Sequence, residues 1–160
     1  MKPVLLATDG SPTAEAATTE AIELSRRLGA PLFVVTAWEL PYAGLGHAPF
    51  PLSANYLEEC AEAAEKIVDA AVERAREKGV TATGLAVHGY PVDEVCRTAA
   101  KTDPQVLVLG AHGWGPIRRA LHGSVSTGVL HHARCPVLVV PVDRSSRESR
   151  RIGATADPAR

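Results

Sequence analysis

The chain has 160 residues, a formal net charge of −1, 46% hydrophobic residues and 4% aromatic residues. This length favours one domain that buries its own core without help from disulfides or metals. The balanced charge offers no basic surface to a polyanion or a membrane, and the few aromatic residues argue against modules that stack nucleic-acid bases. We therefore expect neither nucleic-acid nor membrane partners.

Cysteine usage and the N-terminus indicate the compartment. Cys60, Cys96 and Cys135 lie far apart and form no CxxC pair, which favours reduced thiols over a disulfide framework. Asp9 and Gly10 interrupt the apolar N-terminus before a signal-sequence core forms, and no run approaches the roughly 20 apolar residues of a membrane span. These features predict a soluble, cytoplasmic protein.

The first part of the chain predicts a strand, a helix and a second strand. Residues 3–8 are an apolar run, and Ser11 can cap a helix that begins at Pro12 and stops at Gly29. The run at 32–38 is again apolar throughout. Together these elements form one βαβ unit, whose crossover should be right-handed.

A long loop, a long helix and an edge strand are expected next. Residues 39–54 show no periodicity, and Asn55 and Glu58 then resemble a capping box at a helix start. The helix ends at Gly79 and carries an apolar stripe of six residues at helical spacing: Leu57, Ala61, Ala64, Val68, Ala71 and Ala75. The segment 80–88 alternates more than the other strands, as is typical of an exposed sheet edge.

The remaining folded part predicts two helices and two strands. Pro91 begins a helix with acidic residues in its first turn and the core face Val92, Val95 and Ala99. The continuous apolar run at 106–109 predicts a strand buried on both faces. Ser124 begins a short helix with the apolar positions Val125, Val129, Leu130 and Ala133, and residues 136–140 form the last strand.

The composition changes after Val142. Residues 143–160 contain one isoleucine as their only sizeable apolar residue. We expect a folded domain over residues 1–142 and a disordered tail over residues 143–160.

Three segments should meet where a ligand would bind: residues 9–11 after the first strand, residues 37–38 after the second and residues 110–124 after the fourth. In an open parallel sheet, ligands bind beyond the C-terminal strand ends, at the point where strand order reverses. Gly110 and Gly113 permit positive φ and a close approach of backbone N–H groups to a ligand. Gly123 and Ser124 add N–H groups at a helix start, so the segment 110–124 suits a phosphate chain.

Asp9 follows the first strand and is expected at the same edge. Its carboxylate suits a ribose hydroxyl or a divalent ion carried by phosphates. A structural role in the turn before Pro12 is the alternative, and we favour the ligand role because of the position at a strand end.

The chain resembles the universal stress protein family. The spacing Gly110-x2-Gly113-x9-Gly123-Ser124 matches the ATP-binding signature of that family. The start VLLATDGS and the segment CPVLVVP resemble its first and last strands. The resemblance covers about residues 2–142.

The resemblance implies a fold, a ligand and a set of contacts. It implies an α/β fold, Rossmann-like and similar to the adenine nucleotide alpha hydrolases, with an open five-stranded parallel sheet in the order 3-2-1-4-5 and helices on both faces. It implies ATP as the ligand, with Asp9 at the nucleotide and the backbone of Ala37 at the adenine. The residues around the ribose and phosphates would be Gly110, Gly113, Gly123, Ser124, Val125 and Ser126. It also implies a homodimer in which the edge strand 136–142 pairs with a second subunit.

Other reactive residues carry no catalytic pattern. Arg118 and Arg119 lie within the loop, but a solvated role is at least as plausible as a phosphate contact, so we leave them outside the site. His131, His132 and Cys135 lie near a helix end, where structural or solvated histidines are far commoner than zinc sites. No catalytic residue is assigned.

The resemblance, together with the lack of a catalytic pattern, implies a stress-response regulatory protein that acts as a dimeric, nucleotide-dependent switch. The signature has no Walker lysine and no convincing base, so at most slow ATP hydrolysis is expected, with Mg²⁺ reaching Asp9 only through the nucleotide. One alternative is a nucleotide-free dimerisation and interaction module of the same fold. A weaker alternative is a flavodoxin-like electron carrier, which lacks an evident aromatic pair to hold a flavin.

Overall fold

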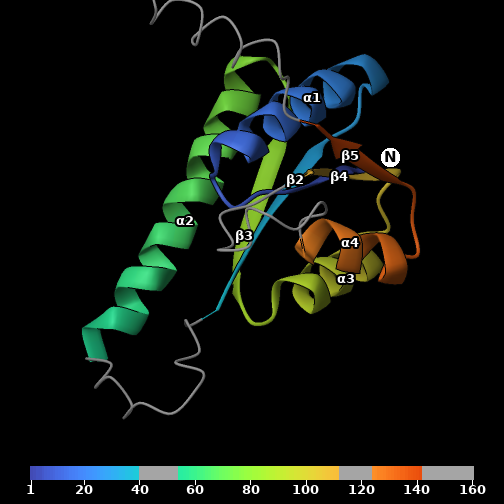
Figure 1. Ribbon diagram of the computed structural model, residues 1–160. Helices are drawn as coiled ribbons and strands as arrows, with labels where there is room; N and C mark the ends of the chain where they lie inside the picture. Colours follow the sequence, from blue (N-terminus) through green and yellow to red (C-terminus); the bar gives the residue numbers. More distant parts are fainter. Residues whose placement is uncertain (40–53, 112–123, 142–160) are drawn as a thin grey trace, which may run out of the picture.

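One parallel sheet with helices on both faces forms the body of the protein (Figure 1). The computed structural model describes residues 1–39, 54–111 and 124–141. The five strands are all parallel, in the order β3-β2-β1-β4-β5, which confirms the predicted fold class. The strands are Val4–Ala7 (β1), Leu32–Trp38 (β2), Ala82–His88 (β3), Val106–Gly110 (β4) and Val137–Val140 (β5).

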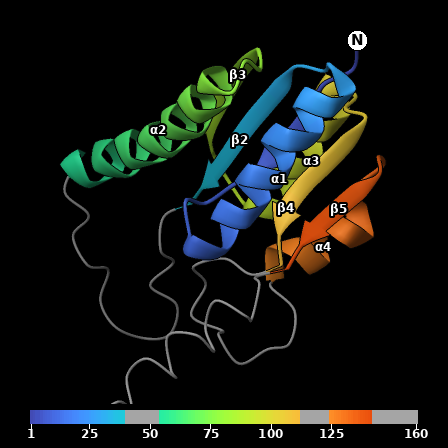
Figure 2. The same ribbon diagram turned by 90° about the horizontal axis from the view of Figure 1, so that it is seen from above.

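Within the described ranges, four helices cover the two faces of this sheet. They are Pro12–Leu28 (α1), Ala54–Glu77 (α2), Pro91–Thr102 (α3) and Ser124–His132 (α4). Helices α1 and α2 lie on one face and α3 and α4 on the other, as the view from above shows (Figure 2). The predicted tail lies outside the described residues.

Helix α1 begins and ends at the residues that the sequence predicts. The Ser11 Oγ accepts a hydrogen bond from the Ala14 N–H at 3.2 Å, and Pro12 occupies the first turn, where its missing N–H costs nothing. Gly29 ends the helix at φ 62°, a conformation that glycine adopts without steric cost. Local sequence therefore determines both ends of this element.

Helix α2 departs from its predicted pattern in the first turns. It begins at Ala54, so the predicted N-cap at Asn55 is wrong, because Asn55 already lies inside the helix. Leu57 is 42% exposed, and burial of the stripe begins only at Ala64. The reason is length: the helix has 24 residues, and its C-terminal part is the part that packs on the sheet. The predicted edge position of β3 is confirmed.

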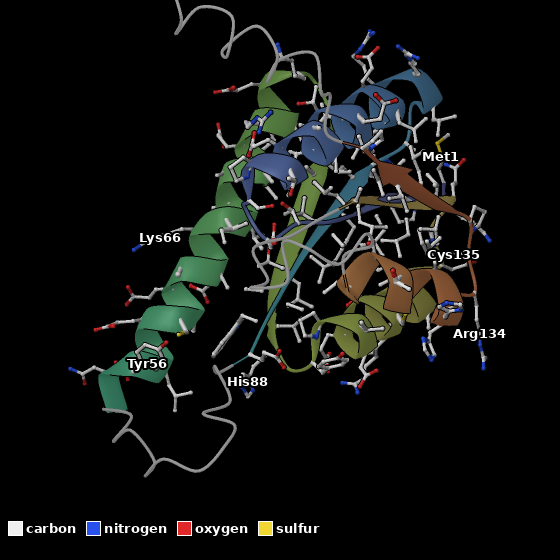
Figure 3. The ribbon with its side chains drawn as sticks, in the orientation of Figure 1. Met1, Tyr56, Lys66, His88, Arg134 and Cys135 are labelled. Atoms are coloured by element: carbon white, nitrogen blue, oxygen red, sulfur yellow. The ribbon has the colours of Figure 1, made fainter. Side chains whose placement is uncertain are left out.

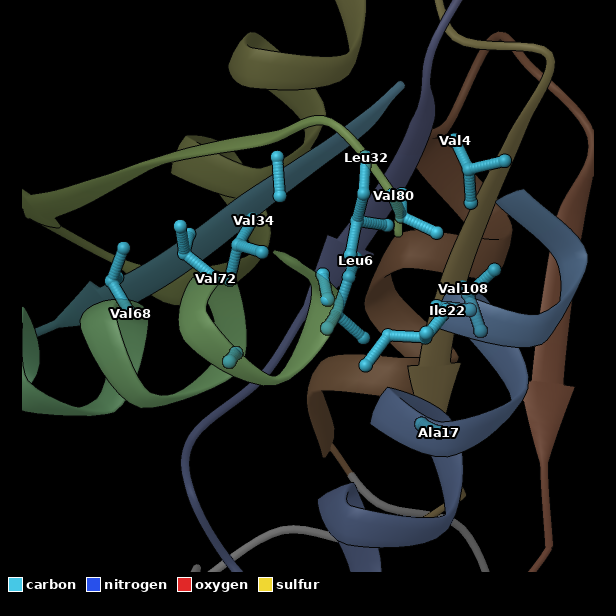
Figure 4. Close-up of a cluster of buried hydrophobic side chains, with 14 of the residues drawn as sticks. Val4, Leu6, Ala17, Ile22, Leu32, Val34, Val68, Val72, Val80 and Val108 are labelled. Carbon is cyan, nitrogen blue, oxygen red and sulfur yellow. The ribbon is translucent and has the colours of Figure 1, made fainter. Parts of the chain in front are cut away.

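Alternate residues of a strand pack into two separate hydrophobic cores, one on each face of the sheet. On β1, Val4 and Leu6 pack under α1 and α2, while Leu5 packs under α3 and α4. The first core is shown in Figure 4, where Leu6 lies among residues of β2, β4 and both covering helices. Leu5 and Leu6 are both fully buried, as expected for a parallel sheet covered on both faces.

The second face has shorter helices that approach each other closely. A Cβ placed on Gly128 of α4 would lie 2.7 Å from the Val92 Cγ2 of α3, so any other residue there would force Val92 or the helices to shift. Val129 is fully buried, but Leu130 is 54% exposed, which corrects its predicted core position. In a helix of nine residues, only one narrow stripe reaches the sheet.

Candidate functional site: the carboxyl edge of strands β4, β1 and β2

Strand register brings three predicted site segments to one level of the sheet edge. Ala7 of β1 pairs with Val35 of β2 and with Leu109 of β4. Asp9 lies two positions after Ala7, and Ala37 lies two positions after Val35. The two residues are therefore neighbours at this edge of the sheet. Neighbouring strands lie about 4.8 Å apart, so a ligand that spans β4 to β2 covers about 10 Å.

The switch point of the sheet lies between β1 and β4. β1 connects through α1 on one face to β2, whereas β4 connects through α4 on the other face to β5. A crevice opens between such diverging connections, and ligands of open α/β sheets bind there. The topology therefore places the Asp9 turn on one side of the crevice and the start of α4 on the other.

The turn that carries Asp9 is held by its own hydrogen bonds. The Ser11 N–H donates to the Asp9 Oδ1 at 3.0 Å, and the Gly10 N–H donates to the Thr8 Oγ1 at 3.3 Å. Gly10 has φ 70°, a conformation that a residue with a side chain rarely adopts. The structural role considered for Asp9 is thus present, and it also orients the carboxylate at the edge of the sheet.

The first turn of α4 is tied to the end of β4. The Ser126 Oγ donates a hydrogen bond to the Ala111 carbonyl at 3.2 Å, and Ser126 is 6% exposed. Ala111 in turn donates its N–H to the Val140 carbonyl at 2.9 Å. The N-terminus of α4, where backbone N–H groups lack helical partners, therefore lies at the carboxyl end of β4.

The structure brings the described site residues to the predicted edge of the sheet. Asp9, Ala37, Gly110 and the segment 124–126 all lie around the switch point. The positive φ that glycine permits at position 110 is not used, because Gly110 ends β4 as an ordinary strand residue. Gly113, Gly123, Arg118 and Arg119 lie outside the described residues.

Sequence reasoning brought the segment 9–11 to this edge but gave no role to Gly10 or to Thr8. Gly10 supplies the positive φ that turns the chain after β1, and the Thr8 hydroxyl accepts its N–H. The Asp-Gly pair directly before Ser-Pro was the available signal, since this combination marks a tight turn.

An aromatic contact lies at the same edge, one strand further out. The rings of Trp38 and His88 have centroids 4.6 Å apart at an interplanar angle of 52°. These residues are paired at the ends of β2 and β3, and the Gly89 N–H donates to the Trp38 carbonyl at 2.9 Å. Trp38 is thus positioned close to Ala37 on the same strand.

His131 and His132 end α4, Cys135 follows that helix, and Cys96 lies on α3. Burial raises the pKa of the Cys96 thiol and that of the Cys135 thiol, which disfavours the reactive thiolate. A ring nitrogen of His132 lies 2.7 Å from the Gly128 carbonyl. Among the described residues no group of three or more His, Cys, Asp or Glu could hold a metal ion. In those same ranges no helix is long and apolar enough to cross a membrane.

Comparisons with known proteins agree with this arrangement. A sequence profile described as the universal stress protein family matches residues 1–141. A universal stress protein of Mycobacterium tuberculosis is 34% identical over 143 residues, which cover 86% of this chain. The chain spans only 44% of the length of that relative.

Two solved structures of similar proteins contain adenine nucleotides. A universal stress protein in complex with cAMP has a TM-score of 0.66 and 27% identity, and the match covers 87% of this chain and 96% of that chain. A universal stress protein of Archaeoglobus fulgidus in complex with dAMP has a TM-score of 0.62 and 26% identity, with coverage of 87% and 97%. With a profile match over nearly nine-tenths of its length and a shared sheet topology, this chain belongs to the universal stress protein family.

Proposed function

We propose that the chain binds ATP at the carboxyl edge of β4, β1 and β2 and acts as a nucleotide-dependent switch in a stress response. The triphosphate lies at the start of α4, where Ser124, Val125 and Ser126 follow Gly113 and Gly123 in sequence. Asp9 contacts the ribose or a Mg²⁺ ion carried by the phosphates, and the backbone of Ala37 meets the adenine. The similar proteins solved with cAMP and dAMP support an adenine nucleotide.

The observation that carries this proposal is the hydrogen bond from Ser126 to Ala111. It holds the first turn of α4 at the end of β4, one strand away from the turn that bears Asp9. A helix N-terminus in that place combines N–H donors with a positive dipole end. Phosphates bound there lie within reach of a cation on the Asp9 carboxylate.

Regulation rather than rapid turnover suits this set of groups. Asp9 already accepts the Ser11 N–H, so it is better suited to orient a ligand than to abstract a proton. Hydrolysis of ATP is therefore expected to be slow at most, and the nucleotide would act through the conformation of the protein or through its choice of partner.

The proposed switch is a cytoplasmic homodimer. β5 lies at the edge of the sheet, and the residues Val137–Val140 are all partly exposed. An apolar edge strand with unpaired backbone groups is a template for strand pairing, and pairing with a second copy through residues 136–142 would cover it. This assembly is expected whether or not nucleotide is bound.

The exposed edge also favours the second candidate function, a nucleotide-free interaction module. In that case Gly113→Ala and Gly123→Val should leave the protein's activity in the cell unchanged. Under the ATP hypothesis, both substitutions abolish nucleotide binding while the fold is retained. A purified protein without flavin absorbance would dismiss the electron-carrier alternative.

Nucleotide analysis of freshly purified protein, followed by calorimetry with ATP, tests the proposal. Ser126→Ala should weaken ATP binding about tenfold, which corresponds to about 1.4 kcal/mol, since the lost hydrogen bond frees the first turn of α4. Thr102→Ala is the matched control, because the Thr102 Oγ1 makes a similar bond to the Thr98 carbonyl at 2.8 Å in α3.

Each result separates the hypotheses. Equal affinity of both variants for ATP would remove Ser126 from the site. A protein that releases no adenine nucleotide on denaturation, and that shows no heat of ATP binding, would leave the interaction module as the function.

A further inference from the structure

The sheet has two open edges, and β3 forms the one opposite to β5. At the start of β3, the Thr81 carbonyl accepts the Leu32 N–H of β2, and after its end the Gly89 N–H donates to the Trp38 carbonyl. Because parallel pairing alternates along a strand, every second residue of β3 directs its N–H and carbonyl away from β2. These residues are Ala82, Gly84, Ala86 and His88. Their backbone groups are the ones that a further strand would pair with.

The side chains of β3 itself offer little resistance to such pairing. The strand contains no proline and no Asp, Glu, Lys or Arg. His88 is its one titratable residue and lies at the carboxyl end (Figure 3). Leu85 is 45% exposed, since α3 packs mainly on β2 on that face of the sheet. An uncharged edge strand of this kind is a template for pairing, so its protection has to come from a neighbouring element.

Arg76, in the last turn of α2, covers the first outward carbonyl of β3. Its Nη2 donates to the Ala82 carbonyl at 3.2 Å, and its Nη1 lies 4.0 Å from the Glu73 carboxylate. Helix α2 can lie this close to β3 because Gly84 has no side chain: a Cβ there would lie 2.3 Å from the Val68 Cγ1. The guanidinium therefore occupies an acceptor that an added strand would need.

Acidic residues follow the same flank of α2. Glu65 and Asp69 lie about three and two helical turns before Arg76, so the helical repeat places them on its side of the helix. Both are exposed. Arg74 lies on the opposite flank, where it pairs with Glu15 of α1. The flank above β3 thus carries negative charge along its middle and one arginine at its end.

The acidic residues would meet their own copies if two β3 strands paired. Antiparallel pairing over the whole strand is centred on Leu85, its middle residue. Val68 packs at Gly84, beside this centre, so Glu65 and Asp69 of both copies would lie near the twofold axis. Like charges gathered at one place repel each other.

We propose that Arg76 guards the edge of β3 against pairing with β3 of a second copy, and that Glu65 and Asp69 reinforce the guard by repulsion. Assembly of the chain is thereby directed to β5. This last consequence rests on the proposed dimer, whereas the guard at β3 does not.

Sedimentation of the full chain over a range of protein concentrations tests the guard. Arg76→Met removes the guanidinium and should form species larger than the wild type at about tenfold lower concentration, since the Ala82 carbonyl becomes available to a second strand. Arg74→Met is the matched control on the other flank of α2 and should sediment as the wild type does. Arg76→Lys retains a donor and should behave likewise. Circular dichroism verifies that each variant is folded.

A proline on β3 closes the edge by a different route. Ala86→Pro removes an outward N–H and leaves the hydrogen bonds to β2 in place. Adding it to Arg76→Met should therefore restore the sizes found for the wild type. Adding Glu65→Gln and Asp69→Asn instead should lower the concentration at which the larger species form still further.

The guard and the proposed dimer can fail separately. The guard is overturned if Arg76→Met and Arg74→Met sediment alike, or if Ala86→Pro leaves the larger species of Arg76→Met in place. It is also overturned if Ala86→Pro alone breaks down an assembly of the wild type, because β3 would then be a natural interface. A monomeric wild type would contradict the dimer through β5, and the comparison of the two arginine variants would still decide on the guard.

Discussion

The two faces of the sheet differ in the length of their covering helices and in how deeply their cores are buried. On the first face, α1 and α2 have 17 and 24 residues and cover a cluster of buried residues from all three central strands and β3. On the second face, α3 and α4 have 12 and 9 residues, and much of the cluster under them is only partly buried. The proposed phosphate-binding turn belongs to the second face.

This difference suggests a division between support and function. Long helices with continuous contact to the sheet stabilise the whole domain cooperatively, whereas short elements with few buried residues open more readily. A helix whose first turn meets a ligand needs that freedom. We therefore expect substitutions on the first face to lower global stability most, and those on the second face to change ligand binding.

Removal of a large side chain from the first core should have the largest effect. Leu6→Ala deletes a fully buried side chain and should lower the free energy of unfolding by about 3–5 kcal/mol. Val129→Ala, on the second face, removes less volume and should cost about 2 kcal/mol. Urea unfolding of both variants measures this, and an equal or larger loss for Val129→Ala would break the contrast.

Added methyl groups test how tightly each face is packed. Gly84→Ala places its Cβ 2.3 Å from the Val68 Cγ1 and 3.2 Å from the Val34 carbonyl, and should cost about 2–3 kcal/mol through overpacking. Gly128→Ala meets Val92 instead, and helix propensity offsets part of the strain, so about 1 kcal/mol remains.

Combining Gly128→Ala with Val92→Ala serves as its control. The second substitution removes the methyl groups that the new Cβ meets, so the two effects should be non-additive in denaturant unfolding. Strict additivity would show that α3 and α4 do not press on each other at Gly128.

Thiol reactivity should report the opening of the second face. Burial raises the pKa of Cys96, as does the nearby Cys135 charge, so alkylation by iodoacetamide at pH 8 should be slower than in the unfolded chain. Val129→Ala should accelerate this alkylation. Leu6→Ala should accelerate it less when the two variants are compared under conditions that give them equal free energies of unfolding. Peptide mass spectrometry measures the rate at each cysteine, and equal acceleration would show that both faces open together.

An exposed ion-pair cluster on the first face should have the smallest effect. Hydrogen bonds from Arg26 and then Arg27 hold the pKa of Glu23 at about 2 instead of its usual 4.5. Because the pKa is lowered in the folded state, this stabilisation is present above pH 4.5 and is lost as the pH falls through about 2. It should be small, since the three side chains lie at the surface.

Carboxyl NMR titration measures the pKa of Glu23 directly. Arg26→Gln should raise it toward the usual value, because Arg26 contributes most to the shift. A Glu23 pKa that stays near 2 in this variant would assign the shift to Arg27 alone.

The fold could be predicted closely because the residues that start and end its elements act locally. Ser11 with Pro12, and Gly29 after the last helical residue, specify the ends of α1 through backbone hydrogen bonds and φ angles. The predicted core positions of Leu57 and Leu130 are wrong for a different reason. Whether an apolar position is covered depends on how far a helix reaches along the sheet, and periodicity carries no such information.

The site could be predicted in part. Strand ends and a parallel order suffice to bring Asp9, Ala37 and Gly110 to one edge, and register confirms this arrangement. The Asp-Gly pair before Ser-Pro indicates a tight turn at Gly10. The hydrogen bonds that hold this turn, from the Gly10 N–H to Thr8 and from the Ser11 N–H to Asp9, are found only in the structure.

The sequence by itself determined the order of elements, most of their ends and the family resemblance, because these depend on neighbours within a few residues. The tertiary structure decided the unequal depth of the two cores and the approach of α3 to α4 at Gly128. It also decided that a recess lies between α1 and α2, where Thr8 and Ile67 are distant in sequence. Contacts between remote segments arise only when the sheet assembles, and this is why these features could not be predicted.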